Sequence, residues 1–548
     1  MQLHEGLFLE RDIVVRETAY LATIFDESAV VGQPEADAAA VNVLKKGGNA
    51  VDAAVAAALL SCVVMPHKVG IGGYGGMMVV HMSGVTRCID FNTVAPAASS
   101  STMFNVARSD GRFGSLVKDR ENEIGHKAIS VPGVLAGLSL GLQEFGKFSL
   151  ADTLAPAIRA CKNGFRVSAE YIQATQDNLK RIRMFPETAK LLLEDNEPPP
   201  SGHRASNPNL GKLLEQIAEK GTDEFYKGRI ADRIVKQIQE NGGLLSKEDM
   251  EAYEARIVDP VHATCMGYDL YGAPLCSSSI SLLQMCRIAE VAELDLWARD
   301  AARLAHGMTE VIRATWLDRY RHFGDPAVVD VPLTTLMSDV SIGATGIEIS
   351  HHISEGTRGQ SLLRPLSSGG TTQICVVDRD RNMVSLTLTH GPAYGSYVTV
   401  PRMGLLMNAG MSRFDPGSGL KNSVAPGKRP IVNMCPAIIT KEGKPCMTIG
   451  ASGGTRISSS LFQVLARRLV LDEDLEWAVG APRVHSEGNE WVMMEEEFGQ
   501  MAPDYLKTVG YTLRTGRAAA QVRAIEVTES NQLLASLDPR IRGKERGI

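Results

Sequence analysis

The sequence predicts a large folded protein that contains both helices and strands, and three observations support this fold class. A chain of 548 residues can bury one large core or the cores of about three to four ordinary domains. Hydrophobic residues make up 44% and charged residues 22%, which is close to the globular average and excludes a disordered or fibrous chain. The 52 glycines, with only 5% aromatic residues, are typical of a mixed α and β chain with many tight turns.

The charge balance and the longest apolar stretch limit the partners of the chain. Lys and Arg number 57 and Asp and Glu 63, a net charge of −6 without the basic excess that nucleic-acid binding requires. The longest apolar run, residues 53–65, has about 13 residues, whereas a membrane helix needs roughly 20. We therefore expect a soluble protein with neither nucleic acid nor a membrane as a partner.

Two further features predict a cytoplasmic location. Residues 1–12 lack the apolar core of a secretion signal. The nine cysteines are an odd number and include no C-x-x-C pair, so we interpret them as reduced core residues rather than a disulfide framework.

The first part of the chain predicts two packed helices, a glycine-rich loop and two strands, in that order. The helices are expected at residues 38–46 and 49–60, with a glycine pair as the stop between them. The glycine-rich loop covers residues 70–76. The strands follow at residues 77–81 and 85–91.

The remaining elements are read from hydrophobic periodicity and glycine signals. Helices are expected at residues 134–142, 154–161, 282–291 and 304–320. From residue 341 to 370 the apolar pattern fades into a segment rich in Gly, Ser and His, which we interpret as a long mobile linker. Residues 371–378 and 382–389 predict a β-hairpin, and a strand at 446–449 leads through a glycine turn into a helix at 457–470.

The glycine loop satisfies the dinucleotide-binding pattern G-x-G-x-x-G through Gly70, Gly72 and Gly75. That fingerprint follows a strand and opens a helix that holds the pyrophosphate, whereas here a strand follows the loop. We therefore predict a loop for close packing and no bound cofactor. No metal site is expected either, because there is no H-E-x-x-H motif and His351-His352 lie in the predicted linker as a solvated pair.

The glycine turn carries a G-x-S-x-G match around Ser452, with Asp472 and His485 following in the order that an α/β-hydrolase uses. Only 33 residues separate Ser452 from His485, which is short for the βα units that normally carry the acid and the base. A second use of the turn is an oxyanion hole made of the N–H groups of Gly453 and Gly454. The third possibility is that this segment is only a glycine-rich connection between a strand and a helix, with no catalytic role.

The junction Gly370-Thr371 joins the predicted linker to the predicted hairpin. A threonine at the start of a strand is usually only a β-branched strand former. If the hairpin turns about Asp380, however, residue i faces residue 760 − i, and Thr371 then lies opposite Thr389. If the chain were cut before Thr371, the freed α-amine, with a reference pKa of roughly 7.7–8.0, would be a base for the hydroxyl of the same residue.

Motifs spread over nearly the whole chain resemble those of γ-glutamyltranspeptidases. In the part before Thr371 these are residues 47–56, 72–76, 90–91 with 95–96, 131–133, Asp318-Arg319 and 324–326. In the part from Thr371 onward they are Thr371-Thr372, 376–378, Gly453-Gly454, Ala481-Pro482-Arg483 and Asp538-Pro539-Arg540. Because these motifs occur in the same order as in the family, the resemblance is specific.

The resemblance implies an α+β fold, the four-layer αββα sandwich of N-terminal-nucleophile (Ntn) hydrolases, made as a precursor that cleaves itself. Residues 1–370 would form the large subunit and residues 371–548 the small subunit, and a homodimer of that pair stays open. Thr371 would be the nucleophile and Thr389 would orient and polarise it. The N–H groups of Gly453 and Gly454 would hold the oxyanion.

The sequence departs from the family where the glutamyl group would be held. The family's carboxylate-binding arginine is replaced by Asn92 and its serine pair by Val432-Asn433. At the positions that contact the ammonium group the chain has Gly391, Gly410 and, in place of an aspartate, Arg413. Two positive charges about 5 Å apart repel by about 3 kcal/mol at an effective dielectric near 20.

These departures predict a small-molecule amide substrate other than glutathione. We expect an acyl group that is small and neutral or anionic, oxamate-like or other, with Arg413 as its carboxylate partner unless that arginine is simply a surface residue. Cephalosporin acylases, and homologues that break a C–C bond, are further divergent members of the family. A catalytically silent, unprocessed binding homologue stays open, as does a serine hydrolase that uses Ser452.

Overall fold

The computed structural model describes residues 23–109, 115–298, 300–361, 370–516, 518–541 and 546–547. Two predictions concern residues outside these ranges. One is the absence of a secretion signal in residues 1–12, and the other is the last part of the predicted linker, residues 362–369.

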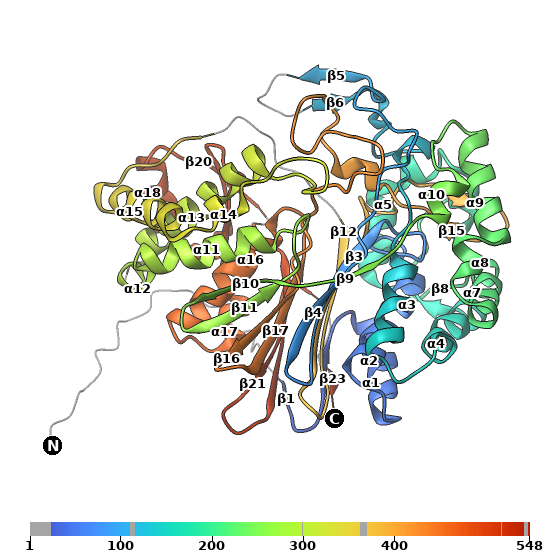
Figure 1. The fold of residues 1–548 in the computed structure, drawn as a ribbon, viewed down its shortest axis with the longest axis horizontal. Coiled ribbons are helices and arrows are strands. Elements are labelled where there is room, and N and C mark those ends of the chain that lie inside the picture. Colours follow the sequence, from blue (N-terminus) through green and yellow to red (C-terminus); the bar gives the residue numbers. More distant parts are fainter. Residues whose placement is uncertain are drawn as a thin grey trace.

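Two seven-stranded sheets form the centre of the molecule (Figure 1). Sheet I has the order β23-β2-β12-β13-β3-β4-β9, and sheet II has the order β1-β22-β21-β17-β16-β11-β10. The strands of sheet I are β2 (Ala29–Val31), β3 (Gly75–Met82), β4 (Val85–Asp90), β9 (Arg256–Val258), β12 (Gly370–Val377), β13 (Met383–Gly391) and β23 (Arg546–Gly547). Those of sheet II are β1 (Thr23–Phe25), β10 (Val261–Cys265), β11 (Tyr268–Gly272), β16 (Ala437–Lys441), β17 (Lys444–Ser452), β21 (Gln521–Val527) and β22 (Leu533–Leu537).

Three hydrophobic clusters show how the layers stack. One cluster lies between the sheets and includes Val79 and Cys375 from sheet I with Ile438 and Ile525 from sheet II. The second packs sheet I against α1 (Pro34–Lys45), α2 (Ala50–Val64), α3 (Val134–Phe145), α4 (Leu150–Asn163), α7 (Pro208–Lys220) and α9 (Arg229–Glu240). The third packs sheet II against α11 (Ser279–Val291), α13 (Ala301–His322), α15 (Asp339–Glu355) and α16 (Arg456–Leu465). The predicted four-layer αββα sandwich is confirmed.

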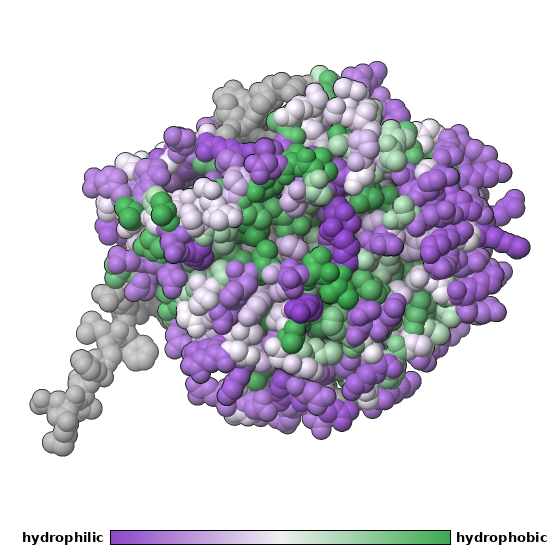
Figure 2. Space-filling model, viewed as in Figure 1, coloured by the Kyte–Doolittle hydropathy of each residue, from purple (hydrophilic) through white to green (hydrophobic). Residues whose placement is uncertain are grey.

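Shorter elements connect these layers. The helices are α5 (Ala169–Ile182), α6 (Pro186–Leu192), α8 (Asp223–Tyr226), α10 (Lys247–Glu251), α12 (Leu294–Trp297), α14 (Leu333–Leu336), α17 (Leu475–Gly480) and α18 (Met501–Thr508). The strands are β5 (Val106–Ser109), β6 (Ser115–Val117), β7 (Phe165–Arg166), β8 (Arg204–Ala205), β14 (Thr399–Val400), β15 (Leu405–Leu406), β18 (Val484–His485), β19 (Trp491–Met494) and β20 (Thr512–Thr515). Figure 2 shows mostly hydrophilic residues on the flank formed by α7, α8 and α9, whose apolar faces turn inward.

The two helices predicted near the start of the chain are confirmed as α1 and α2. Asn49 begins α2 with a capping box: its side chain accepts from the N–H groups of Val51 and Asp52, while the Asp52 carboxylate accepts from the N–H of Asn49. All but one residue of α2 are buried, so this helix is apolar on every side and packs against β12 and β13. It supports the back of the hairpin that carries the candidate site.

The predicted linker is wrong for its first half, residues 341–355. Residues 339–355 form α15, which Ser338 caps by accepting from the N–H of Ser341. Ile342, Ile349 and Ile353 are buried against α11 and α13, so tertiary packing stabilises a helix whose Gly and Ser content favours a loop. His351 and His352 therefore belong to this helix, and Nδ1 of His352 lies 2.9 Å from the hydroxyl of Thr357.

The cysteines behave as core residues. Eight of the nine are buried and Cys446 is half-buried, and all are free thiols. Within the described ranges, no helix combines the length and the apolar character that a membrane span requires. The same part of the chain holds no group of three or more His, Cys, Asp or Glu side chains placed to bind a metal ion.

Candidate active site

The predicted hairpin is confirmed as β12 and β13, and it brings Thr371 and Thr389 to one end of sheet I. The predicted register, in which residue i faces residue 760 − i, holds from Thr372 opposite Leu388 to Val377 opposite Met383. It fails at Thr371, because Gly370 pairs with Gly391 and a β-bulge lies between. Thr371 therefore lies beside both Thr389 and the residue after it, rather than in a simple cross-strand pair with Thr389.

The hydroxyl of Thr389 contacts the peptide group that precedes Thr371. It donates to the carbonyl oxygen of Gly370 at 2.5 Å and accepts from the N–H of Gly391 at 2.9 Å. Thr371 and Thr389 are 8% and 2% exposed, so this contact lies in a largely desolvated environment. A hydroxyl that donates to a carbonyl oxygen in such an environment polarises that carbonyl for nucleophilic attack.

Strand β17 of sheet II faces this hairpin and runs toward the same end. The Ser385 hydroxyl donates to the carbonyl of Ile449 at 2.8 Å, and a Cβ added at Gly450 would lie 2.2 Å from the side chain of Gln373. Moving from Ser385 toward Thr389 along β13 therefore corresponds to moving beyond Gly450 along β17. The turn that follows β17, Gly453-Gly454, thus lies at the end of the layers where Thr371 and Thr389 lie.

Gly453 and Gly454 connect β17 to α16, as the sequence predicted. Their φ angles are +158° and +66°, and a Cβ at Gly453 would lie only 2.6 Å from the Cβ of Ala520. A side chain is therefore excluded at Gly453 by contact as well as by conformation. Two successive glycines at the start of a helix present backbone N–H groups, which is the donor type that an oxyanion hole uses.

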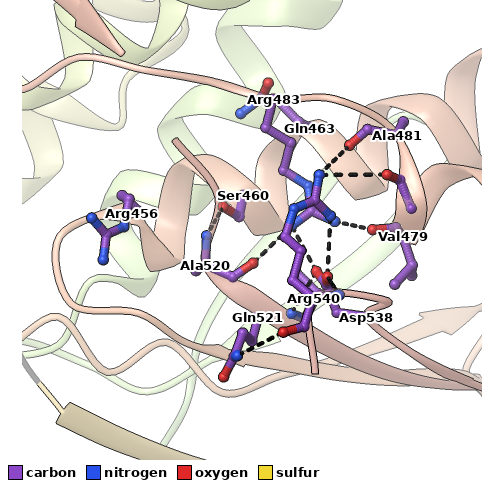
Figure 3. A network of polar contacts seen from close by, with 12 residues as sticks. Arg456, Ser460, Gln463, Val479, Ala481, Arg483, Ala520, Gln521, Asp538 and Arg540 are labelled. Atoms are coloured by element: carbon purple, nitrogen blue, oxygen red, sulfur yellow. Dashed lines mark hydrogen bonds and ion pairs between the residues drawn. The ribbon is translucent and has the colours of Figure 1, made fainter. Parts of the chain in front are cut away.

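A buried ion pair holds the residue against which Gly453 packs (Figure 3). The carbonyl of Ala520 accepts from Arg483 and its N–H donates to the hydroxyl of Ser460. Arg483 in turn pairs with Asp538 at 2.9 Å, and both side chains are almost fully buried. The motif residues Arg483 and Asp538 thus hold Ala520 in place, and Ala520 packs against the glycine turn at Gly453.

Arg540 completes this network. Its guanidinium pairs with Asp538 at 3.1 Å and with Glu495. Burial alone would raise the pKa of Asp538, but the charges of Arg483 and Arg540, with hydrogen bonds from backbone N–H groups, hold the pKa below its ordinary value. Asp538 is therefore a buried carboxylate whose charge is balanced by two arginines.

The three residues that a serine hydrolase would use here, Ser452, Asp472 and His485, contact other groups. The Ser452 hydroxyl accepts from Arg523 at 3.1 Å. Nδ1 of His485 lies 2.8 Å from the Ser459 hydroxyl, and Asp472 pairs with Arg468 on the surface. These contacts do not assemble the hydrogen-bonded chain of serine, histidine and acid that a triad requires.

Asn92 and Asn433 lie on neighbouring segments. The side-chain amide of Asn92 donates to the carbonyl of Pro430 at 2.9 Å, three residues before Asn433. Arg319 donates to the side-chain oxygen of Asn433 at 3.0 Å and to the carbonyl of Val432 at 2.9 Å. Because the side-chain oxygen of Asn433 accepts from Arg319, the NH₂ group is the part of this amide that can donate to a ligand.

Tyr74 occupies the space around Gly391 and Gly410. A Cβ added at Gly391 would lie 3.6 Å from the Tyr74 ring, and a Cβ at Gly410 would lie 2.9 Å from the Cβ of Tyr74 and 1.9 Å from the Ser130 hydroxyl oxygen. No side chain fits at Gly410 without displacing these neighbours. Tyr74 and Ser130 therefore occupy the space that a side chain at Gly410 would need.

Arg413 follows Gly410 in the same short helical turn, η3 (Gly410–Arg413), and its charge acts on Tyr74. Burial raises the pKa of the Tyr74 hydroxyl to about 12, and the nearby Arg413 charge and Thr389 side chain partly oppose this rise. Tyr74 therefore lies near the Arg413 charge, and the next residue along the chain, Gly75, pairs with Thr389. Sequence reasoning assigned no role to Tyr74, although an aromatic residue inside a glycine run was the available signal.

The glycine loop is confirmed as a close-packing element that opens a strand. A Cβ at Gly75 would lie 2.1 Å from the carbonyl oxygen of Phe91, and one at Gly76 would lie 2.3 Å from the Phe91 ring. Gly75 is also the first residue of β3 and pairs with Thr389. The loop thus sets the position of Tyr74, which immediately precedes this pairing.

Comparisons with known proteins identify one family over nearly the whole chain. The family model described as gamma-glutamyltranspeptidase matches residues 36–548. A glutathione hydrolase proenzyme from Pseudomonas aeruginosa is 35% identical over 99% of this chain and 98% of its own length. An acylase ACY 1 proenzyme from Pseudomonas sp. (strain V22) is 31% identical over 90% of this chain and 89% of its own length.

Solved structures support the fold. A cephalosporin acylase from Bacillus halodurans superposes with a TM-score of 0.87 at 22% identity, over 98% of this chain and 99% of that chain. The γ-glutamyltranspeptidase of Helicobacter pylori gives a TM-score of 0.55 at 28% identity, over 62% of this chain and 93% of that chain. From the family match, the relatives and the four-layer fold together, the chain belongs to the γ-glutamyltranspeptidase family of Ntn hydrolases.

Proposed function

We propose that this chain is a self-cleaving threonine amidohydrolase or acyltransferase whose nucleophile is Thr371. The observation that carries the proposal is the hydrogen bond from the Thr389 hydroxyl to the Gly370 carbonyl, which activates the peptide bond before the nucleophile. The large subunit would be residues 1–370 and the small subunit residues 371–548.

Self-cleavage would proceed by an acyl shift. The Thr371 hydroxyl oxygen attacks the Gly370 carbonyl carbon, and the hydrogen bond from Thr389 strengthens as charge develops on the carbonyl oxygen. The C–N bond breaks, the hydroxyl proton passes to the Thr371 nitrogen, and Gly370 is left as an ester on the threonine oxygen. Water then hydrolyses this ester, which releases the Gly370 carboxylate and leaves Thr371 with a free α-amine and hydroxyl.

Turnover would use the same threonine. The freed α-amine accepts the hydroxyl proton as the oxygen attacks the substrate amide, and the N–H groups of Gly453 and Gly454 hold the oxyanion. The proton passes to the departing amine, and the acyl group stays on Thr371 as an ester. Water or a second amine then takes the acyl group and restores the threonine.

The residues around the nucleophile support an acyl group without a free α-ammonium group. Arg413 places a positive charge near Tyr74, whose ring lies beside Gly391, and the space at Gly410 is taken by the Ser130 hydroxyl and the Cβ of Tyr74. Asn433 offers a neutral NH₂ donor where the family has a serine pair. Such a site suits a small neutral or anionic acyl group and disfavours a γ-glutamyl group.

Two assays test this proposal. A denaturing gel of the purified protein should show a 370-residue and a 178-residue chain in place of the 548-residue one. A panel of amides should include oxamate, monoamides of short dicarboxylic acids, glutathione and γ-glutamyl-p-nitroanilide. A chain that stays whole and inactive on the panel would instead support a silent binding homologue, and a whole but active chain would favour a hydrolase based on Ser452.

Arg413→Asp should lower kcat/KM on the preferred acyl donor by roughly 10- to 150-fold. The reason is the loss of one charge-assisted hydrogen bond, about 1.5–3 kcal/mol. The measurement compares wild type and variant on γ-glutamyl-p-nitroanilide and on a dicarboxylic acyl anilide of matched length.

Arg379→Asp is the matched control, because Arg379 is exposed at the turn of the hairpin, at the opposite end from Thr371. It should leave kcat/KM within about twofold of wild type, as surface substitutions usually do. A wild-type enzyme that clearly prefers the γ-glutamyl compound would contradict the assignment of Arg413.

A further inference from the structure

One segment of the chain connects the two groups that the proposed function assigns to the acyl group, Arg413 and Asn433. Residues 414–431 begin directly after Arg413 and end two residues before Asn433, and we call them the bridging loop. Just before the loop, the turn η3 is attached to β13, because the N–H of Ala409 donates to the carbonyl of His390 at 3.0 Å. His390 directly follows the threonine of β13 that belongs to the candidate site, so the loop starts beside that site.

The end of the bridging loop lies at the same end of sheet I. The carbonyl of Pro430 accepts from the side chain of Asn92 at 2.9 Å. Asn92 lies beside Gly75, because a Cβ added at Gly75 would be 3.0 Å from the Cα of Asn92. Gly75 in turn pairs with Thr389 between β3 and β13. The loop therefore leaves the candidate site at one end and returns to it at the other.

The side chain of Asn422 joins the two ends of the bridging loop. Its NH₂ group donates to the carbonyl of Arg413 at 2.9 Å, and its side-chain oxygen accepts from the N–H of Ile431 at 2.9 Å. A carbonyl can only accept and an N–H can only donate, so these two partners fix the orientation of the amide. The backbone carbonyl of Asn422 also accepts from the N–H of Asp415 at 3.0 Å. One half-buried residue thus sets the spacing between the start and the end of the loop.

The rest of the bridging loop is fixed to its surroundings. The Lys428 side chain is only 2% exposed, and its ammonium group donates to the carbonyls of Lys421 at 2.7 Å and Ser423 at 2.8 Å, inside the loop. The N–H of Arg429 donates to the carboxylate of Asp325 at 2.8 Å, which attaches the loop to the large-subunit part of the chain. The spacing that Asn422 sets therefore belongs to a loop that is held along its length.

We propose that Asn422 is a positioning residue that sets which acyl-chain length the site accepts. Its amide holds the backbone of Arg413 against the segment that carries Asn433, so the two donor groups keep one spacing. An acyl group that reaches both donors while its amide carbonyl lies at the nucleophile must then have one length. Without this amide, each donor moves with its own end of the loop and follows acyl groups of other lengths. This inference rests on the proposed function and adds to it the residue that sets substrate length.

The test compares acyl donors that differ by one methylene group. The substrates are the mono-p-nitroanilides of succinic, glutaric and adipic acid, and kcat/KM is measured for each with wild type, Asn422→Ala and Asn207→Ala. Wild type should prefer one length over its neighbours by at least about tenfold, since one methylene group in a fitted pocket changes kcat/KM by roughly 10- to 200-fold. In Asn422→Ala this preference should fall below about threefold.

Asn207→Ala is the matched control. Asn207 is also a half-buried asparagine whose amide joins two backbone segments: it donates to the carbonyl of Gly404 at 2.8 Å and accepts from the N–H of Leu210 at 3.1 Å. It begins helix α7, however, in the helix layer outside sheet I. Its length preference should stay within about twofold of wild type.

The ratio of two kcat/KM values separates a positioning role from a loss of stability. Both values come from the same preparation, so the fraction of folded enzyme cancels. Self-cleavage needs no acyl donor, so every variant that folds should split as wild type does. If Asn422→Ala does not split, Asn422→Asp replaces it. This variant keeps the acceptor for Ile431 but loses the donor to Arg413, and its length preference should fall in the same way.

Each outcome bears on one claim. A wild-type chain that neither splits nor turns over any amide contradicts the proposed function itself. A wild type that splits but turns over none of the three anilides, or all three equally, contradicts only the role of Asn422. So does an Asn422 variant that keeps the wild-type preference. An equal loss of preference in Asn207→Ala would also overturn the inference, because any disturbed backbone contact would then have the same effect.

Discussion

Replacing Thr371 by Ala should leave a single 548-residue chain with no measurable amide turnover. Self-cleavage and acyl transfer both need the same hydroxyl oxygen, so a variant without this oxygen loses both reactions. The gel should show no 178-residue band at any time, and no product should form from any amide that wild type hydrolyses.

Thr371→Ser is the informative companion to this variant. It keeps the hydroxyl and loses only the methyl group, so it should retain part of the cleavage and part of the turnover. A Thr371→Ala protein that still splits at this junction, or that keeps wild-type turnover, would show that Thr371 is not the nucleophile.

Replacing Asp538 by Ala should lower the free energy of unfolding by about 3–5 kcal/mol. The change leaves Arg483 buried without its carboxylate partner, which is among the most destabilising events in a protein core. It also loosens Ala520, which supports Gly453, so the proposed oxyanion donors should shift and turnover should fall. Urea unfolding is best measured in the Thr371→Ala background, where a single chain keeps the equilibrium simple.

Asp504→Ala is the control for this prediction. Asp504 also pairs with a cation, Lys507 at 3.1 Å, but both side chains are more than half exposed. Surface pairs of this kind contribute little, so stability should change by less than about 0.5 kcal/mol. Equal losses in the two variants would contradict the role assigned to the buried pair.

The Asp538 pair also predicts a pH dependence. Because the pKa of Asp538 is lower in the folded protein, its contribution is present above the ordinary aspartate pKa of about 3.9 and is lost as the pH falls below it. The difference in stability between the parent protein and Asp538→Ala should therefore narrow below about pH 4. A difference that grows as the pH falls would contradict the assignment.

Local sequence signals predicted the elements that carry the site. The glycine pair Gly47-Gly48 predicted the break between the first two helices, and α2 begins at Ala50, one residue after the predicted start. The two strand-like runs at residues 371–378 and 382–389 predicted the hairpin, with its turn about Asp380. The helix predicted at residues 457–470 exists as α16 followed by a π-helical turn at Ala466–Val470.

The errors arose where distant contacts decide the structure. The helix α15 was missed because its buried isoleucines, Ile342, Ile349 and Ile353, gain stability only from α11 and α13. The bulge at Thr371 depends on the pairing of Gly370 with Gly391, whose φ is +105°, and strand alternation carries no sign of it. Tyr74 acquires its place only when the glycine loop, β13 and η3 come together.

The most direct test of the central claim is intact-mass and N-terminal analysis of the purified wild-type protein. We expect two chains. The shorter one should have 178 residues and begin at Thr371-Thr372-Gln373 with a free α-amine. A single uncut chain that nevertheless hydrolyses amides, or a cut at any other position in the active protein, would contradict it.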